Sequence, residues 1–512
     1  MASTWINRRE FLVTAGTGAG ALALPGPAQA GKTAGAKKRP NILFIISDEH
    51  NASVMGCAGN TIIHSPNLDR LAAGGVMFDN CYCNSPLCVP SRLSLTSGKY
   101  ASRVGAWNNN CTLPSADYPS LPRVLNAAGY ESFLCGKMHY ESTRRYGFTE
   151  IGGDMNQGIM PGFGERRAPD DLAPEPGISN RFDEFHPGEH SHVLDHDRAV
   201  TAGTVEFLKN RKEGDAPFFL LAGYLAPHFP LIVPEKYWDE YKGKVPMPVV
   251  PEGYLDSLPR NYKHLRVGFN VEDVPEDIVR KGRELYYGLV QWVDEEIGKV
   301  MQALDAAGLA EDTVIVYTAD HGENMGEHGL WWKNCLYDTA DRVPLIVRWP
   351  GHWRGGQHRT GACSLVDVVQ TVAEVGGAKV PGDWNGDSMK GWLDNPEAHW
   401  KDLAVSEYYA HNIASGYAMI RMGAFKYVYH TRPDAGHEPE RELYDLKTDP
   451  GELHNLAGKP EYKDKIADMH TRLVKELGED PDQTEQRCRA DGKKGYAGAE
   501  QKKKRKHGKG DE

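Results

Sequence analysis

Four apolar segments of strand length each run into charged or histidine residues, and this pattern constrains the fold more than any other feature of the chain. The segments are residues 41–47, 130–135, 218–224 and 313–318. Continuous apolar runs of this length are typical of parallel strands that are buried on both faces. The fold is therefore predicted to be α/β, with a mostly parallel sheet flanked by helices.

The polar residues that follow these strands are expected to converge. In open α/β sheets, ligands bind outside the carboxyl ends of the strands, so segments distant in sequence meet in one crevice. The residues concerned are Asp48 and Glu49, Lys137 and His139, His228, and Asp320 and His321. The sequence thus predicts one site built from four strand ends.

Amphipathic segments between the strands supply the crossovers that a parallel sheet requires. Over residues 284–304 apolar side chains recur at helical spacing, and Gly308 follows as a stop signal. A narrower apolar stripe over residues 197–208 precedes the strand at 218. After about residue 380, strand-like segments at 403–408 and 417–429 favour a smaller α+β subdomain over residues 381–485, or an extension of the first core.

The first thirty residues are typical of an export signal. Arg8-Arg9 precede an apolar run over residues 11–24 and the small-residue pattern Ala28-Gln29-Ala30. The apolar run has about 14 residues, whereas a membrane-spanning helix needs about 20. We expect a twin-arginine-type signal over residues 1–30, a linker over 31–39, export to the periplasm or the cell exterior, and no stable membrane insertion.

Composition excludes other classes of protein. With 40% hydrophobic and 25% charged residues the chain is typical of a soluble globular protein, and a net charge of -11 argues against nucleic acid as the main partner. The basic run at residues 501–507 is predicted to belong to a disordered tail over residues 486–512. Nine cysteines are too sparse for a disulfide-dense scaffold, and the sequence does not reveal any pairing.

Asp48, Glu49, Asp320 and His321 are candidate metal ligands. Carboxylate oxygens suit a hard cation, so calcium is favoured over zinc, with magnesium as the alternative. A single acidic residue at a strand end is more often part of a surface turn, but two acidic pairs on separate strands favour a site. Histidine is the poorest fit to a hard cation, and Glu49 either ligates the ion or holds one of its ligands.

The run Cys88-Val89-Pro90-Ser91-Arg92 places a cysteine at a predicted helix start. Proline suits the first turn of a helix, and the unpaired N–H groups there favour an anion. Arg92, one turn further on, has a guanidinium that can bind the same anion. The alternative is a buried structural cysteine, because free cysteine commonly packs as a small hydrophobe.

This run resembles the signature in which sulfatases convert a cysteine into formylglycine. Residues 129–139, 320–333 and 443–456 are also similar to sulfatase motifs. There are small departures: Cys135 occupies a position where another small or aliphatic residue is usual, and residues 95–98 replace the more usual Leu-Thr-Gly ending. Over about residues 40–457 the chain resembles the type I, formylglycine-dependent sulfatases of the alkaline-phosphatase superfamily.

The resemblance implies a catalytic domain over residues 40–380 and a defined reaction. A formylglycine-generating enzyme would convert Cys88 into an aldehyde. One hydroxyl of the hydrated aldehyde would attack the sulfur of a sulfate ester, and the second would then expel inorganic sulfate. The implied substrate is a sulfated small molecule or, preferably for an exported enzyme, a sulfated polysaccharide.

The resemblance also implies the roles of the cationic residues. Arg92 and Lys137 would hold the formylglycine diol, and His139 would take its proton. His228 and Lys333 would bind the sulfate and assist the leaving oxygen. His228 is favoured as the acid, since histidine titrates near neutral pH whereas lysine needs a lowered pKa.

Two other functions fit the same residues. A phosphonate or phosphate ester hydrolase of the same superfamily would bind a similar tetrahedral anion, and a catalytically silent glycan-binding homologue would keep the fold without the reaction. The histidines at positions 186, 190, 192 and 196 could ligate another metal, but their spacing matches no recognised ligand set. We expect them on a solvated loop outside the site.

Overall fold

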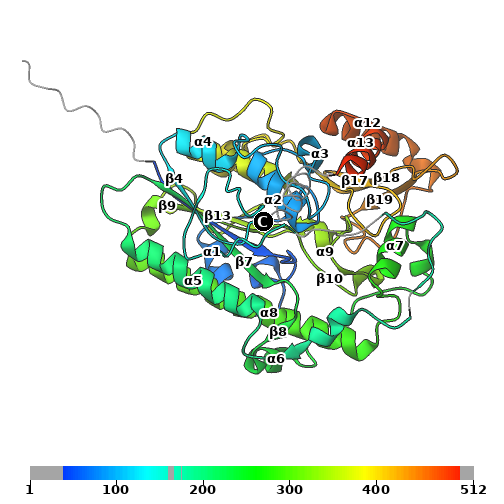
Figure 1. Cartoon of the computed structure of the whole chain (residues 1–512), viewed down its shortest axis with the longest axis horizontal. Coiled ribbons are helices and arrows are strands. Elements are labelled where there is room, and N and C mark those ends of the chain that lie inside the picture. Colours follow the sequence, from blue (N-terminus) through cyan, green and yellow to red (C-terminus); the bar gives the residue numbers. More distant parts are fainter. Residues whose placement is uncertain (1–38, 160–165, 175, 496–512) are drawn as a thin grey trace, which may run out of the picture. The chain divides into compact units, whose positions relative to one another are not determined.

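A mostly parallel sheet of eight strands organises the described part of the chain, which comprises residues 39–159, 166–174 and 176–495 of the computed structural model (Figure 1). In spatial order the strands are β14 (Gln357–Arg359), β2 (Val76–Phe78), β13 (Leu345–Arg348), β9 (Thr313–Ala319), β1 (Asn41–Asp48), β7 (Phe218–Pro227), β4 (Glu131–Gly136) and β5 (Thr149–Glu150). Only β13 runs antiparallel to its neighbours among these pairings. The predicted fold class is confirmed, and the four predicted strands lie side by side in the order β9-β1-β7-β4.

Helices cover both faces of this sheet, as the apolar runs require. Along β1, Leu43 and Ile45 pack in the core that includes α1 (Pro66–Ala73), α5 (His192–Asn210) and α8 (Glu276–Ala306). The alternate residues of β1 point to the other face. There they pack in the core that includes α2 (Cys88–Ser97), α4 (Leu121–Ala127) and α10 (Leu365–Val375).

Helix α5 begins earlier than its apolar stripe predicts. Its N-cap is Ser191, whose side chain accepts a hydrogen bond from the backbone N–H of Leu194 at 3.1 Å. The prediction that His192 and His196 lie on a solvated loop is therefore wrong, because a capped polar turn precedes the apolar stripe. His186 lies in the short strand β6 (His186–Pro187), and His190 is exposed.

A second sheet, antiparallel, follows the main one in sequence. Its strands are β16 (Leu403–Tyr408), β17 (Tyr417–Met422), β18 (Phe425–His430) and β19 (Glu440–Asp445). One face packs on α12 (Lys463–Leu477), and the other packs against Leu336 and Tyr337. The fully buried Lys426 of β18 donates to the carbonyl oxygen of Leu336 at 2.9 Å and pairs with Glu452 at 2.7 Å. These contacts fix the segment that follows Lys333.

The last described helix corrects the predicted start of the disordered tail. Helix α13 (Pro481–Lys494) is capped by Asp480 and buries Cys488. Arg487 lies over the ring of Trp107 at 4.9 Å. The charged composition concealed this helix, because its N-cap and initial proline carry the signal rather than an apolar stripe. Two predicted segments lie outside the described residues: the signal over residues 1–30, and the linker over residues 31–39 except for its last residue. Residues 496–512 also lie outside them.

Shorter elements connect these layers. They are the helices α3 (Ala101–Val104), α6 (Glu235–Tyr241), α7 (Arg260–Gly268), α9 (Asp338–Asp341) and α11 (Lys390–Asp394), and the strands β3 (Cys81–Tyr82), β8 (Ile232–Val233), β10 (Asn324–Met325), β11 (Trp331–Trp332), β12 (Arg342–Val343) and β15 (Cys363–Ser364). Across the described ranges, none of the helices combines the length and apolarity needed to cross a bilayer.

Candidate active site

Arg92 joins the carboxyl ends of strands β1 and β9. Its Nε donates to Asp320 Oδ2 at 2.7 Å, and its Nη2 donates to Asp48 Oδ2 at 3.1 Å. Nη1 donates to the carbonyl oxygen of Lys137 at 2.6 Å. The side chains of Arg92 and both aspartates are fully buried, so these charge-assisted hydrogen bonds fix the two carboxylates away from water.

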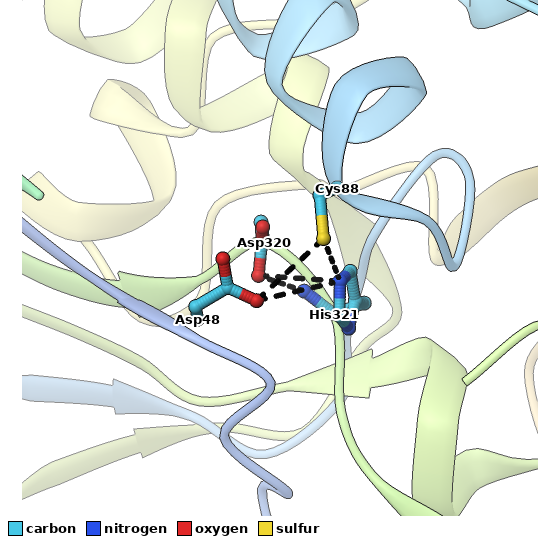
Figure 2. Close-up of side chains that lie close together, drawn as sticks. All are labelled: Asp48, Cys88, Asp320 and His321. Carbon is cyan, nitrogen blue, oxygen red and sulfur yellow. Dashed lines mark hydrogen bonds and ion pairs between the residues drawn. The ribbon is translucent and has the colours of Figure 1, made fainter. Parts of the chain in front are cut away.

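Cys88 is the first residue of α2, and its thiol points at the same two strand ends (Figure 2). Its Sγ lies 3.3 Å from His321 Nε2 and 3.7 Å from Asp48 Oδ1. Lys333 Nζ lies 3.2 Å from Sγ, and Lys137 Nζ lies 4.0 Å from it. The predicted position of Cys88 at a helix N-terminus is confirmed.

The turn after β4 brings Lys137 and His139 to the same cluster. Gly136 has a φ of 102°, and a Cβ there would collide with the backbone of β7. Only glycine fits this close approach without strain. Lys137 then forms an ion pair with Asp48, and the imidazole of His139, whose own φ is 60°, interacts with Cys88.

Glu49 holds two further cations. His228 Nε2 lies 3.3 Å from Glu49 Oε2, and Lys333 Nζ lies 3.3 Å from Glu49 Oε1. His228 Nδ1 lies 2.6 Å from the carbonyl oxygen of Phe229, so Nδ1 carries a proton and donates it to that oxygen. The structure thus brings every sequence-predicted site residue into one cluster at the ends of β1, β4, β7 and β9.

Burial and charge act in opposite directions on Cys88. Burial raises the pKa of its thiol, but Lys137, Lys333 and His321 together lower that pKa well below its ordinary value. Burial, with help from Lys137, lowers the pKa of His139 to about 4. The cluster therefore favours an anion at the position of Sγ and a neutral imidazole beside it.

The acidic residues suit a hard divalent cation. Ligand atoms of Asp48, Asp320, His321 and Cys88 all lie within 4.8 Å of one another, and Glu49 belongs to a second such group that shares Asp48. Burial raises the pKa of Asp320, and although Arg92 lowers it, the nearby Asp48 raises it further. Carboxylates that crowd one another in a buried site are the donor set that calcium or magnesium neutralises.

A cavity of about 220 Å³ opens onto the cluster, and Cys88, Lys137, His139, His228 and Lys333 line it. Sequence reasoning missed or set aside several other residues of its wall, which include Gln157, Arg181, His192, Phe229, Phe269 and His411. The capping serine before His192 could have placed that residue on a helix. No motif or periodicity points to Arg181, which lies in the short 3₁₀ helix η2 (Asn180–Glu184).

Comparisons with known proteins agree with this geometry. The family model described as sulfatase matches residues 40–378, and one described as N-sulphoglucosamine sulphohydrolase, C-terminal, matches residues 326–479. The N-acetylglucosamine-6-O-sulfatase of Bacteroides thetaiotaomicron is 29% identical to this chain over an alignment of 525 residues, gaps included. The alignment covers 88% of this chain and 88% of the relative.

Solved structures share the fold. The structure of a protein in complex with its substrate, D-glucosamine-2-N,6-O-disulfate, has a TM-score of 0.69 and 26% identity, and covers 87% of this chain and 99% of its own. A phosphonate monoester hydrolase of Agrobacterium radiobacter also has a TM-score of 0.69, with 23% identity, and covers 86% of this chain and 96% of its own.

The fold and the site together define a hydrolase of the alkaline-phosphatase superfamily. More specifically, the chain belongs to the sulfatase family, whose model spans every residue of the cluster from Asp48 to Lys333. It is a sulfuric ester hydrolase.

Because of the charge cluster, we expect the Cys88 thiol to be unusually reactive in protein whose Cys88 is unmodified. Iodoacetamide at pH 6.5 should alkylate Cys88 before Cys57, as measured by mass spectrometry of peptides from timed samples. Cys57 is the more exposed of the two, but burial raises its pKa to about 12. The fraction of Cys57 that is thiolate falls roughly tenfold for each unit by which the pH lies below that pKa, so very little of it reacts at pH 6.5. Labelling of Cys57 first would contradict this assignment.

Proposed function

We propose that this enzyme hydrolyses a sulfate ester on a sugar, using a formylglycine made from Cys88 by a formylglycine-generating enzyme. The observation that carries the proposal is the position of Cys88 Sγ in the cavity wall, with Lys333 at 3.2 Å, His321 at 3.3 Å and Lys137 at 4.0 Å. An anionic oxygen at that position would have three cationic or donor groups around it. The sugar assignment is supported by the N-acetylglucosamine-6-O-sulfatase relative and by the disulfated sugar bound in the similar structure.

A hydrated aldehyde at residue 88 supplies one hydroxyl that attacks sulfur and a second whose deprotonation expels sulfate. His139 is positioned to accept that proton, because its imidazole is neutral and interacts with Cys88. Lys137, paired with Asp48, lies near enough to orient the diol. Arg92 hydrogen-bonds to both aspartates and so acts here by positioning carboxylates rather than by holding the diol.

His228 and Lys333 are proposed to bind the sulfate and assist the leaving alcohol. In the chain with an unmodified Cys88, burial would lower the pKa of Lys333, but Cys88 and Glu49 raise it above its ordinary value. After conversion of Cys88, the ion pair with Glu49 at 3.3 Å still favours the charged form of this lysine. A lysine with a raised pKa is a poor proton donor near neutral pH. His228 is therefore the better acid, because its Nδ1–H is bound to the Phe229 carbonyl and its Nε2 faces the Glu49 and Lys333 pair.

Calcium, or magnesium in its place, is proposed to be held by Asp48, Glu49, Asp320 and His321. A divalent ion there would supply positive charge beside residue 88, which favours an ionised hydroxyl and a bound sulfate oxygen. The chain's own contribution is to hold the carboxylates: Arg92 binds two of them, and the N–H of Glu49 donates to Asp320 Oδ1 at 3.2 Å. The twin-arginine-type signal favours action outside the cytoplasm, in the periplasm or beyond the cell.

A phosphonate ester hydrolase is the nearest rival, because the phosphonate monoester hydrolase of Agrobacterium radiobacter shares the fold and its ester, like a sulfate ester, is built on a tetrahedral anion. Rates on aryl sulfate and aryl phosphate or phosphonate esters separate the two enzymes. The proposal requires the larger kcat/KM on sulfate. A silent glycan-binding protein would turn over neither ester.

Replacing the proposed nucleophile tests the reaction directly. Cys88→Ala should lower turnover of 4-nitrophenyl sulfate by at least about a thousandfold, because it removes the group that attacks sulfur. Circular dichroism should show an unchanged fold. The matched control Cys57→Ala removes a cysteine that does not line the cavity and should keep activity within about twofold. A folded Cys88→Ala protein with more than a tenth of the activity would exclude this nucleophile.

The metal site is tested by titrating the metal-free protein with calcium in a calorimeter. Asp320→Asn should weaken calcium binding by at least roughly tenfold, because it removes a charged ligand. Asp294→Asn is the control, because Asp294 is also buried but accepts hydrogen bonds from the backbone of Asn67 and Leu68 at the start of α1. Equal calcium affinity in the wild type and Asp320→Asn would rule out the ligand set.

A further inference from the structure

Within the described residues, Arg181 is a cation of the cavity wall that forms no ion pair, although the more distant Glu49 and Glu323 act on its charge. The other cationic side chains there are paired: Lys137 with Asp48, and His228 and Lys333 with Glu49. Across residues 39–159, 166–174 and 176–495, no hydrogen bond or ion pair is found for the guanidinium of Arg181. A half-buried guanidinium without an acceptor carries a desolvation cost that a bound anion would offset.

Three aromatic rings hold this guanidinium in place. Its Cζ lies 4.3 Å from the ring centre of Phe229, 5.2 Å from that of Trp332 and 5.6 Å from that of Phe269. Phe229 in turn packs on Trp332 with ring centres 5.1 Å apart. Cation–π contacts of this kind orient an arginine while leaving its N–H donors free, so the group is preorganised to bind a ligand.

The rings also place Arg181 relative to the sulfate groups. Phe229 follows His228 in the chain and stacks on its imidazole with ring centres 4.4 Å apart. Trp332 directly precedes Lys333. Arg181 thus packs on the residues adjacent to the two proposed sulfate-binding cations, on the same cavity but on a separate element, η2.

The cavity has room for more than the ester sulfate. Its volume of about 220 Å³ is many times the roughly 10–15 Å³ of cavity volume that holds one water molecule. The part of the wall formed by Phe229, Phe269 and Arg181 combines apolar surface with one bidentate donor. A sugar ring that bears an anionic substituent matches both features.

We propose that Arg181 binds a second anionic group, a sulfate or a carboxylate, on the sugar that carries the ester sulfate. The inference rests on the proposed function and narrows its substrate class to sugars with at least two anionic groups. The guanidinium fork would make two parallel N–H···O hydrogen bonds to the second group. Arg181 would therefore act on substrate affinity and selectivity rather than on the sulfur centre.

The test compares matched substrates in the wild type and Arg181→Met, which keeps the side chain's apolar bulk and removes its charge. N-acetylglucosamine 6-sulfate is compared with glucosamine 2-N,6-O-disulfate, and a methyl-esterified sulfated uronic acid with the free acid. On at least one doubly anionic substrate, Arg181→Met should raise KM by roughly 10- to 100-fold, the value of a charge-assisted hydrogen-bond pair. For the singly charged partners and for 4-nitrophenyl sulfate, KM should change by no more than about twofold, which is within the scatter of near-neutral substitutions.

The two pairs identify which anion Arg181 prefers, and Arg181→Lys should restore part of the loss. Arg211→Met is the matched control, because Arg211 also lies over two rings, those of Phe207 and Phe218, but at the opposite end of β7. Arg211→Met should leave the KM for both substrates of each pair unchanged. An equal loss on singly and doubly charged substrates, or no loss on either, would overturn the proposal.

A binding measurement keeps this test independent of turnover. In the Cys88→Ala background, calorimetry compares the affinity of each sugar with Arg181 intact and with Arg181→Met added. Tighter binding of a doubly anionic sugar that disappears with Arg181→Met supports the inference even if the wild type hydrolyses no sulfate ester, which would contradict the proposed function alone. Affinities that do not respond to Arg181 overturn the inference even if sulfatase activity is found.

Discussion

A fully buried arginine between two aspartates holds the site together. Arg92 hydrogen-bonds to Asp48 at the end of β1 and to Asp320 just after β9, and all three side chains are shielded from water. Removing one partner of a buried ion pair costs about 3–5 kcal/mol, because the other charge is left without compensation. The β1–β9 ladder sets the relative positions of the two strand ends, and the contact with Arg92 fixes the two carboxylates there.

The same helix supplies both the arginine and the reactive residue. Cys88 and Arg92 are one turn apart on α2, so the ion pairs that dock Arg92 on the sheet also orient Cys88 toward Asp48 and His321. Lys137 and Lys333 then arrive from two other segments and surround the thiol. Positive charge is thus concentrated where a sulfate ester would react, and Arg181 adds a further cation to the wall of the same cavity.

The sheet and the cluster were predictable from the sequence, and much of the cavity wall was not. Strands such as β1 and β9 are continuous apolar runs, and the residues after them converge because parallel strands end at one edge. The direction of Arg92 depends on how α2 docks, and the direction of Arg181 depends on three rings from distant segments. Neither contact is marked by a periodic pattern of residues in the sequence. Helix α13 was missed because its capping residues, not its composition, carry the information.

Residue 88 is proposed to act as an aldehyde within this charge cluster. Mass spectrometry of the peptide that contains residue 88, from protein produced together with a formylglycine-generating enzyme, tests it most directly. We expect an aldehyde at position 88 that reacts with a hydrazide probe, and sulfate ester turnover that rises in proportion to the occupancy of that aldehyde. Full turnover by protein in which residue 88 remains a cysteine thiol would contradict it.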